Sequence, residues 1–80
     1  QQVHLVTPDA SPASFAAPPG TRVSVFSLGD AAHGVIERGL QWELEDAAFT
    51  NAMPLGVSNV TTHERFEIGV RDGMLLVVIG

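Results

Sequence analysis

The chain of 80 residues contains no cysteine and no lysine, and each absence excludes a class of protein. Without cysteine, neither a disulfide framework nor a thiolate metal site can form, which favours a cytoplasmic location over secretion. The chain has four arginines, well separated in sequence, and nine acidic residues, so its formal net charge is −5 at pH 7. A surface of this sign repels polyanions, and we therefore expect no nucleic-acid partner.

Long apolar segments are also absent. The run from Met74 to Ile79 has the length of a strand and falls far short of the roughly 20 residues that span a bilayer, so we expect no membrane partner. Hydrophobic residues make up 45% of the chain and charged residues 16%, a balance typical of one folded domain over residues 1–80. Because the chain starts at Gln1 and ends directly after an apolar strand, we expect it to be the C-terminal part of a longer protein.

The first quarter of the chain is rich in proline. Residues 1–19 hold four of the five prolines, which precludes a helix and predicts an irregular lead-in. The pattern changes at Arg22, where Val23 and Val25 face one way and Phe26 the other. This alternation predicts a strand with two partly buried faces.

Alternation continues in the middle of the chain. Residues 29–34 predict a turn, followed by a short strand that ends near Gly39. The next residues place Leu40, Trp42 and Leu44 on one face, which predicts a half-buried strand. Residues 45–53 are too few for a stable helix and precede a proline, so we predict a loop there.

The last third of the chain predicts three more strands. Residues 55–60 form a short one, and residues 65–70 alternate with Phe66, Ile68 and Val70 inward. Asp72-Gly73 predicts a tight turn into a hairpin with the apolar strand 74–79, which should be central or covered on both faces. About six to eight short strands without a helix predict an all-β fold, an antiparallel β-sandwich.

No catalytic constellation is visible in the sequence. The three histidines share no spacing that suits a metal, and Walker, dinucleotide and GxSxG motifs are missing. Glu43, Glu45 and Asp46 cluster after Trp42 and could favour a cation, but such clusters usually form a solvated rim. We therefore predict no catalytic residue, no metal ligand and no cofactor within this chain.

Trp42 and the Ser58-Asn59 pair allow two interpretations on the residues alone. A tryptophan on the apolar face of a strand packs in a core more often than it serves as a ligand platform, although the indole suits both roles. Asparagine at a strand end often satisfies its own turn. Neither feature decides between structure and binding.

The order of five segments resembles a known family. VSVFSLG, a Gly-Val pair, GLQWEL, LGVSN and a final DGMLLVVI follow one another as in the C-terminal thiamin-binding domain of thiamin pyrophosphokinases. The resemblance covers roughly Gly20 to Ile79, and its specificity lies in the order and spacing of the motifs, because no single motif is strong. It implies an antiparallel β-sandwich that follows an upstream α/β domain holding ATP and Mg²⁺.

The resemblance also implies a site at which thiamin binds. Trp42 would form a wall of the pocket, since thiamin can stack on an indole and attract it through its cationic ring. Ser58 and Asn59 would meet the aminopyrimidine edge. Gly39 and Leu40 would shape the approach, and Gly56 would let the backbone of the Ser-Asn pair come close. Dimerisation would place the site between domains of opposite subunits, so thiamin and a second subunit are the implied partners.

The expected function is that of the thiamin-binding and dimerising domain of an ATP-dependent kinase that makes thiamin diphosphate. The 80 residues alone are expected to be inactive, because the chemistry would reside in the upstream domain. The alternative is a non-enzymatic assembly or regulatory domain of the same ancestry, with Trp42 buried. A third interpretation is a carbohydrate-binding sandwich that uses Trp42 as a sugar platform.

Overall fold

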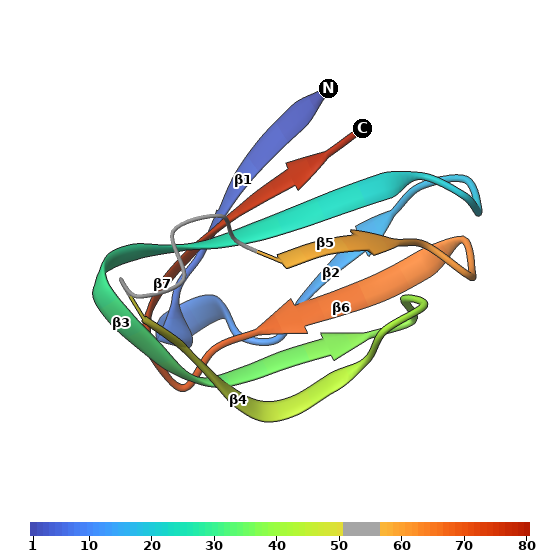
Figure 1. Cartoon of the computed structure of the whole chain (residues 1–80). Helices are drawn as coiled ribbons and strands as arrows, with labels where there is room; N and C mark the ends of the chain where they lie inside the picture. Colours follow the sequence, from blue (N-terminus) through green and yellow to red (C-terminus); the bar gives the residue numbers. More distant parts are fainter. Residues whose placement is uncertain (51–56) are drawn as a thin grey trace.

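The computed structural model describes residues 1–50 and 57–80 and consists almost entirely of antiparallel strands (Figure 1). Within these two ranges there is one 3-10 turn, η1, at Pro8–Ala10. The strands of the same residues are β1 (Gln2–Val6), β2 (Ala13–Ala16), β3 (Arg22–Arg38), β4 (Leu44–Thr50), β5 (Val57–Val60), β6 (Arg65–Gly69) and β7 (Asp72–Ile79).

Strand β3 is long enough to belong to two sheets. Its first half pairs with β7 and β5, and its second half pairs with β6 and β4. The register with β7 shifts between Leu28 and His33, where the strand bends. Gly34 adopts a positive φ of 66° in this bend, and a Cβ there would lie 2.6 Å from the Cβ of Arg71, so only glycine fits.

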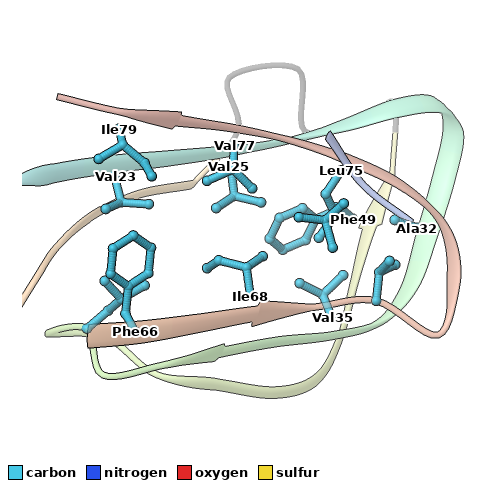
Figure 2. Close-up of a cluster of buried hydrophobic side chains, with 13 residues drawn as sticks. Val23, Val25, Ala32, Val35, Phe49, Phe66, Ile68, Leu75, Val77 and Ile79 are labelled. Atoms are coloured by element: carbon cyan, nitrogen blue, oxygen red, sulfur yellow. The ribbon is translucent and has the colours of Figure 1, made fainter. Parts of the chain in front are cut away.

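The two sheets pack face to face around one apolar core. The first sheet has the order β1-β7-β3-β5, and the second joins β2, β6, the second half of β3 and β4. Figure 2 shows Val25 and Val77 of the first sheet above Ile68 of the second, and Val23 above Phe66. This arrangement confirms the predicted antiparallel β-sandwich.

The predicted hairpin between the last two strands is wrong. Strand β6 pairs with β2 and β3, whereas β7 pairs with β1 and β3 in the other sheet. The chain therefore crosses from one layer to the other between Gly69 and Asp72, and the Arg71 amide donates to the carbonyl of His33 at the crossing. The inward side chains predicted for residues 65–70 are nevertheless correct: Phe66 and Ile68 of β6, and Val70 just after it, are buried.

Four further sequence predictions are corrected. The irregular lead-in contains β1 and β2, which pair with β7 and β6. The expected turn at 29–34 is a bend inside β3. The expected strand at 40–44 is a connection, because strand β4 begins only at Leu44 and runs through the segment predicted to be a loop as far as Thr50. Residues 51–53 of that loop lie outside the described residues.

The outer face of the first sheet is apolar. Side chains that alternate with the core residues of β1 and β7 point away from it, and Val3, Leu5 and Met74 are 58%, 55% and 43% exposed. Across the strands, Leu5 lies opposite Leu76, which in turn lies opposite Phe26 on β3. Strand β7 is central, as predicted, but only one of its faces is covered.

Candidate ligand-binding site

The connection from β3 to β4, residues 39–43, forms a loop that carries Trp42. We call it the Trp42 loop. It lies along the end of β5: Leu40 forms a bridge with Thr61, and the Gln41 amide donates to the Val60 carbonyl at 2.8 Å. The loop also closes on itself, because Glu43 Oε2 accepts the Gly39 N–H at 2.8 Å. These bonds replace the strand pairing that the sequence predicts for this segment.

The side-chain amide of Asn59 holds the centre of the loop. Its Oδ1 accepts the Trp42 backbone N–H at 3.0 Å, and its Nδ2 donates to the Trp42 carbonyl. Asn59 is 1% exposed, and Oδ1 also accepts the amide of Val60 at 3.0 Å. One side chain thus supplies both the donor and the acceptor that a neighbouring strand would supply in a sheet.

Behind Asn59 lies a buried carboxyl group. Glu37 on β3 is fully buried, and its Oε1 accepts the second N–H of Asn59 Nδ2 at 3.2 Å. Its Oε2 has no hydrogen-bond partner among the described residues. Burial raises the pKa of Glu37 from 4.5 to about 7, while the bond from Asn59 lowers it by a smaller amount.

Gly39 lets the chain leave β3 toward the loop. Its φ is +81°, and a Cβ on this residue would lie 2.7 Å from the carbonyl oxygen of Arg65. The Gly39 carbonyl accepts bonds from the amide and the hydroxyl of Thr62 at 3.3 and 3.2 Å. Gly39 is therefore required by geometry on both sides of its backbone.

The Trp42 indole is 56% exposed, which contradicts the interpretation that it packs in the core. Leu40 does enter the core and is 3% exposed, so the loop is anchored by one apolar side chain and presents another to solvent. A large aromatic surface left in water on a loop tied by so many hydrogen bonds is suited to contact a planar ligand.

The structure brings together four of the five predicted site residues. Four of them meet at the loop: Gly39, Leu40, Trp42 and Asn59. The fifth, Ser58 on β5, pairs with Ser24 of β3, and its side chain points to the outer face of the first sheet. Gly56 lies outside the described residues. Contact of these side chains with thiamin stays a prediction.

The acidic residues near the loop are engaged with partners in the protein. Arg38 makes two bonds to Glu45, at 2.9 and 3.1 Å, and this contact lowers the pKa of Glu45. Asp46 contacts Arg71 at 3.1 Å. Both pairs are exposed and contribute little to stability. Among the described residues, no group of three or more side chains is arranged to hold a metal ion, and no helix is long and apolar enough to cross a membrane.

Sequence reasoning did not foresee the contacts that Glu37 and Glu43 make at the loop. Glu37 could have been found from its parity, because it follows the buried Val35 by two residues on the same face of β3. An acidic residue at an inward position of a strand indicates a buried polar contact. The bond of Glu43 to Gly39 has no comparable signal, because it depends on the path of the loop.

These features define a β-sandwich domain with an exposed tryptophan on a hydrogen-bonded loop. A sequence profile described as "Thiamin pyrophosphokinase, vitamin B1 binding domain" matches residues 4–75. The chain belongs to this family of vitamin B1-binding domains. No curated protein matches the chain.

Solved structures of thiamin pyrophosphokinases share the fold. The enzyme from Bacillus subtilis superposes with a TM-score of 0.80 at 17% identity, over 94% of this chain. The enzyme from Geobacillus thermodenitrificans gives 0.80 at 15% identity over 98%, and a family protein from Enterococcus faecalis gives 0.66 at 15% over 98%. This chain spans 35% of the length of each of those chains.

Proposed function

We propose that the chain is the thiamin-binding and dimerising domain of an ATP-dependent thiamin pyrophosphokinase. The observation that carries the proposal is the half-exposed Trp42 on a loop fixed by Asn59, in a chain of the vitamin B1-binding family. The family supplies the ligand, and the loop supplies a surface on which that ligand can rest.

The physical match between thiamin and the loop is direct. Thiamin has two flat rings, of which one is a permanent cation, and an indole attracts such a group through stacking and cation-π contact worth about 0.5 to 2 kcal/mol. The chain carries a net charge of −5, which favours the approach of a cation. Binding at Trp42 would thus combine local contact with long-range attraction.

The role assigned to this domain is to position the acceptor. Pyrophosphoryl transfer depends on orienting the thiamin hydroxyl and on neutralising the charge of the transferred phosphates. Among the described residues, no group of three or more side chains is arranged to hold a metal ion. We assign ATP and Mg²⁺ to an α/β domain of a longer protein. The share of 35% that the chain takes of each solved enzyme leaves room for such a domain.

The apolar outer face of the first sheet supports the proposed dimer. Val3, Leu5 and Met74 expose large side chains there, and the adjoining Leu76 and Phe26 are also uncharged. Contiguous apolar surface of this kind marks an interface more often than free surface. A second copy of the same face could cover it with two-fold symmetry, as in most homodimers.

Titration calorimetry of the chain with thiamin tests the binding proposal. We expect saturable binding by the wild type, a loss of about tenfold or more in Trp42→Ala, and near wild-type affinity in Trp42→Phe, which keeps an aromatic face. Circular dichroism must show that all three chains are folded. Absence of binding by the folded wild type would overturn the proposal, and binding of glycans in place of thiamin would favour the carbohydrate alternative.

A further inference from the structure

We propose that Glu37 is a positioning residue for the ligand platform: by fixing the orientation of the Asn59 amide, it holds the Trp42 loop in the conformation that presents the indole. The role of the loop as a ligand platform rests on the proposed function. The mechanical coupling from Glu37 to the loop does not, and can be tested without any ligand.

The location of Glu37 is unfavourable for a carboxyl group. On β3 it lies opposite Leu44 of β4 and Ile68 of β6, and it is fully buried. Burying such a group is costly, and an apolar residue of similar volume would stabilise the core at least as well. Its Oε2 atom, which has no hydrogen-bond partner in the part of the chain that the structure describes, adds to this cost. The stability of the sandwich therefore gives no reason for a glutamate here.

The hydrogen bonds of Asn59 do give a reason. Glu37 Oε1 accepts one N–H of Asn59 Nδ2, so the Asn59 amide must present its nitrogen toward β3. In that orientation Oδ1 faces the N–H groups of Trp42 and Val60. A flipped amide would turn its oxygen toward the Glu37 oxygen and its own N–H groups toward those two donors, which is unfavourable at every contact.

The coupling runs through two side chains from one sheet to the other. Glu37 belongs to the half of β3 that pairs with β4 and β6, and Asn59 belongs to β5 on the first sheet. Asn59 then bonds both backbone groups of Trp42. A change at Glu37 is thus expected to act on the loop through Asn59 without touching the indole.

Two substitutions separate positioning from packing. Glu37→Met removes the acceptor and keeps an unbranched side chain, and Glu37→Gln keeps an acceptor oxygen for Asn59. The matched control is Glu67→Met, since Glu67 is on β6 next to Ile68 and opposite Arg38, and no hydrogen bond of the loop described above involves its side chain. Hydrogen exchange of the Trp42 backbone amide, measured by NMR at pH 8, reports on its bond to Asn59, and the amide of Val77 in the core of β7 serves as the reference.

We expect Glu37→Met to speed exchange at Trp42 by about tenfold relative to Val77, with a free energy of unfolding equal to or above that of the wild type. Glu37→Gln and Glu67→Met should leave the Trp42 exchange rate within about twofold of the wild type. Thiamin affinity should follow the Trp42 exchange rate across the four chains.

Other outcomes overturn the inference. An unchanged exchange rate at Trp42 in Glu37→Met would show that Asn59 holds the loop without its bond to Glu37. Equal acceleration at Trp42 and Val77, or failure to fold, would show that Glu37 stabilises the core as a whole. If exchange behaves as expected but no chain binds thiamin, the proposed function fails while the coupling of Glu37 to the loop stands.

Discussion

The sequence allowed either a structural role or a ligand contact for both Asn59 and Trp42, and the structure places their two side chains differently. Asn59 was expected at the edge of the ligand, but its amide is buried and engaged with backbone groups of the loop. On the residues alone, Trp42 was expected in the core more often than at a ligand, and the residue is 56% exposed. Residue type and alternation could not separate these roles, because exposure at this position depends on where the loop leaves β3.

Truncation of Asn59 should weaken both the fold and the site. Asn59→Ala leaves the Trp42 N–H and carbonyl without their partners, so we expect a loss of about 1 to 3 kcal/mol in the free energy of unfolding and weaker thiamin binding. Urea denaturation and calorimetry measure the two effects. Ser58→Ala is the control, since Ser58 is exposed and its removal should change stability by less than about 0.5 kcal/mol. Equal stability of the two variants would contradict the role given to Asn59.

The buried carboxyl of Glu37 should make stability depend on pH. Because burial raises its pKa from 4.5 to about 7, the folded chain holds a proton in this window that the unfolded chain has lost. Stability contributed by this group is therefore complete below pH 4.5, falls as the pH rises to about 7, and changes little above it, with a total of about 3 kcal/mol.

Urea denaturation between pH 4.5 and 8 measures this dependence. The Glu37→Gln variant cannot ionise and should lack the fall, so the difference between the two profiles isolates Glu37 from the histidines that titrate in the same range. Parallel profiles for the wild type and Glu37→Gln would contradict the assignment.

Among the strands, β3 shows where local sequence patterns stop being informative. The alternation of apolar and polar residues correctly predicted its first half and its inward valines, because successive side chains of a strand point to opposite faces. It could not show that one strand bends and pairs in two sheets, or that β6 and β7 do not pair with each other. Strand pairing depends on contacts between residues far apart in sequence. Asp72-Gly73 was predicted to form a tight turn, and Gly73 does have a positive φ of +93°. The chain passes from one sheet to the other near this point, however, and forms no hairpin.

The exit of the loop from β3 should tolerate only glycine. Gly39→Ala combines backbone strain at φ +81° with a Cβ placed 2.7 Å from the Arg65 carbonyl oxygen, so we expect a loss of more than about 2 kcal/mol. Gly20→Ala is the matched control, because Gly20 has a φ of +87° with no atom within 4 Å of an added Cβ. Thermal unfolding of both variants measures the difference. Identical losses would show that the close approach at Gly39 has no energetic effect.

The whole molecule has two unlike outer faces. The first sheet exposes apolar residues such as Leu5 and Met74, while the outward residues of the second include Arg38, Arg65 and Glu67. Composition alone indicated a folded acidic domain but not this separation, which follows from which strands share a sheet. The fold class could be predicted from the sequence because it needs only the number and type of the elements.

Charging the apolar face should disperse the proposed dimer. Leu5→Asp places a carboxylate on β1 in that face, opposite Leu76, so we expect a change from dimer to monomer in sedimentation velocity. Ala16→Asp, at an exposed position of β2 in the other sheet, should leave the dimer unchanged. A monomeric wild type, or dispersal by Ala16→Asp alone, would contradict the location of the interface.

The chain by itself should not turn over ATP. Because the proposed function assigns ATP and Mg²⁺ to another domain, an assay with thiamin, ATP and Mg²⁺ is expected to yield no AMP or thiamin diphosphate above background. Formation of AMP that depends on thiamin would contradict the assignment of the chemistry to another domain. A preparation that binds thiamin in calorimetry provides the control for active protein.

Mapping by ¹H–¹⁵N NMR shows where on the chain thiamin binds. If thiamin rests on the loop held by Asn59, titration should shift the indole N–H of Trp42, the backbone amide of Gly39 and the side-chain amide of Asn59. The amides of Val3 and Leu5 on the outer face of the first sheet should not move. Shifts confined to that outer face, or no shifts at saturating thiamin in the folded chain, would contradict binding of thiamin at the Trp42 loop.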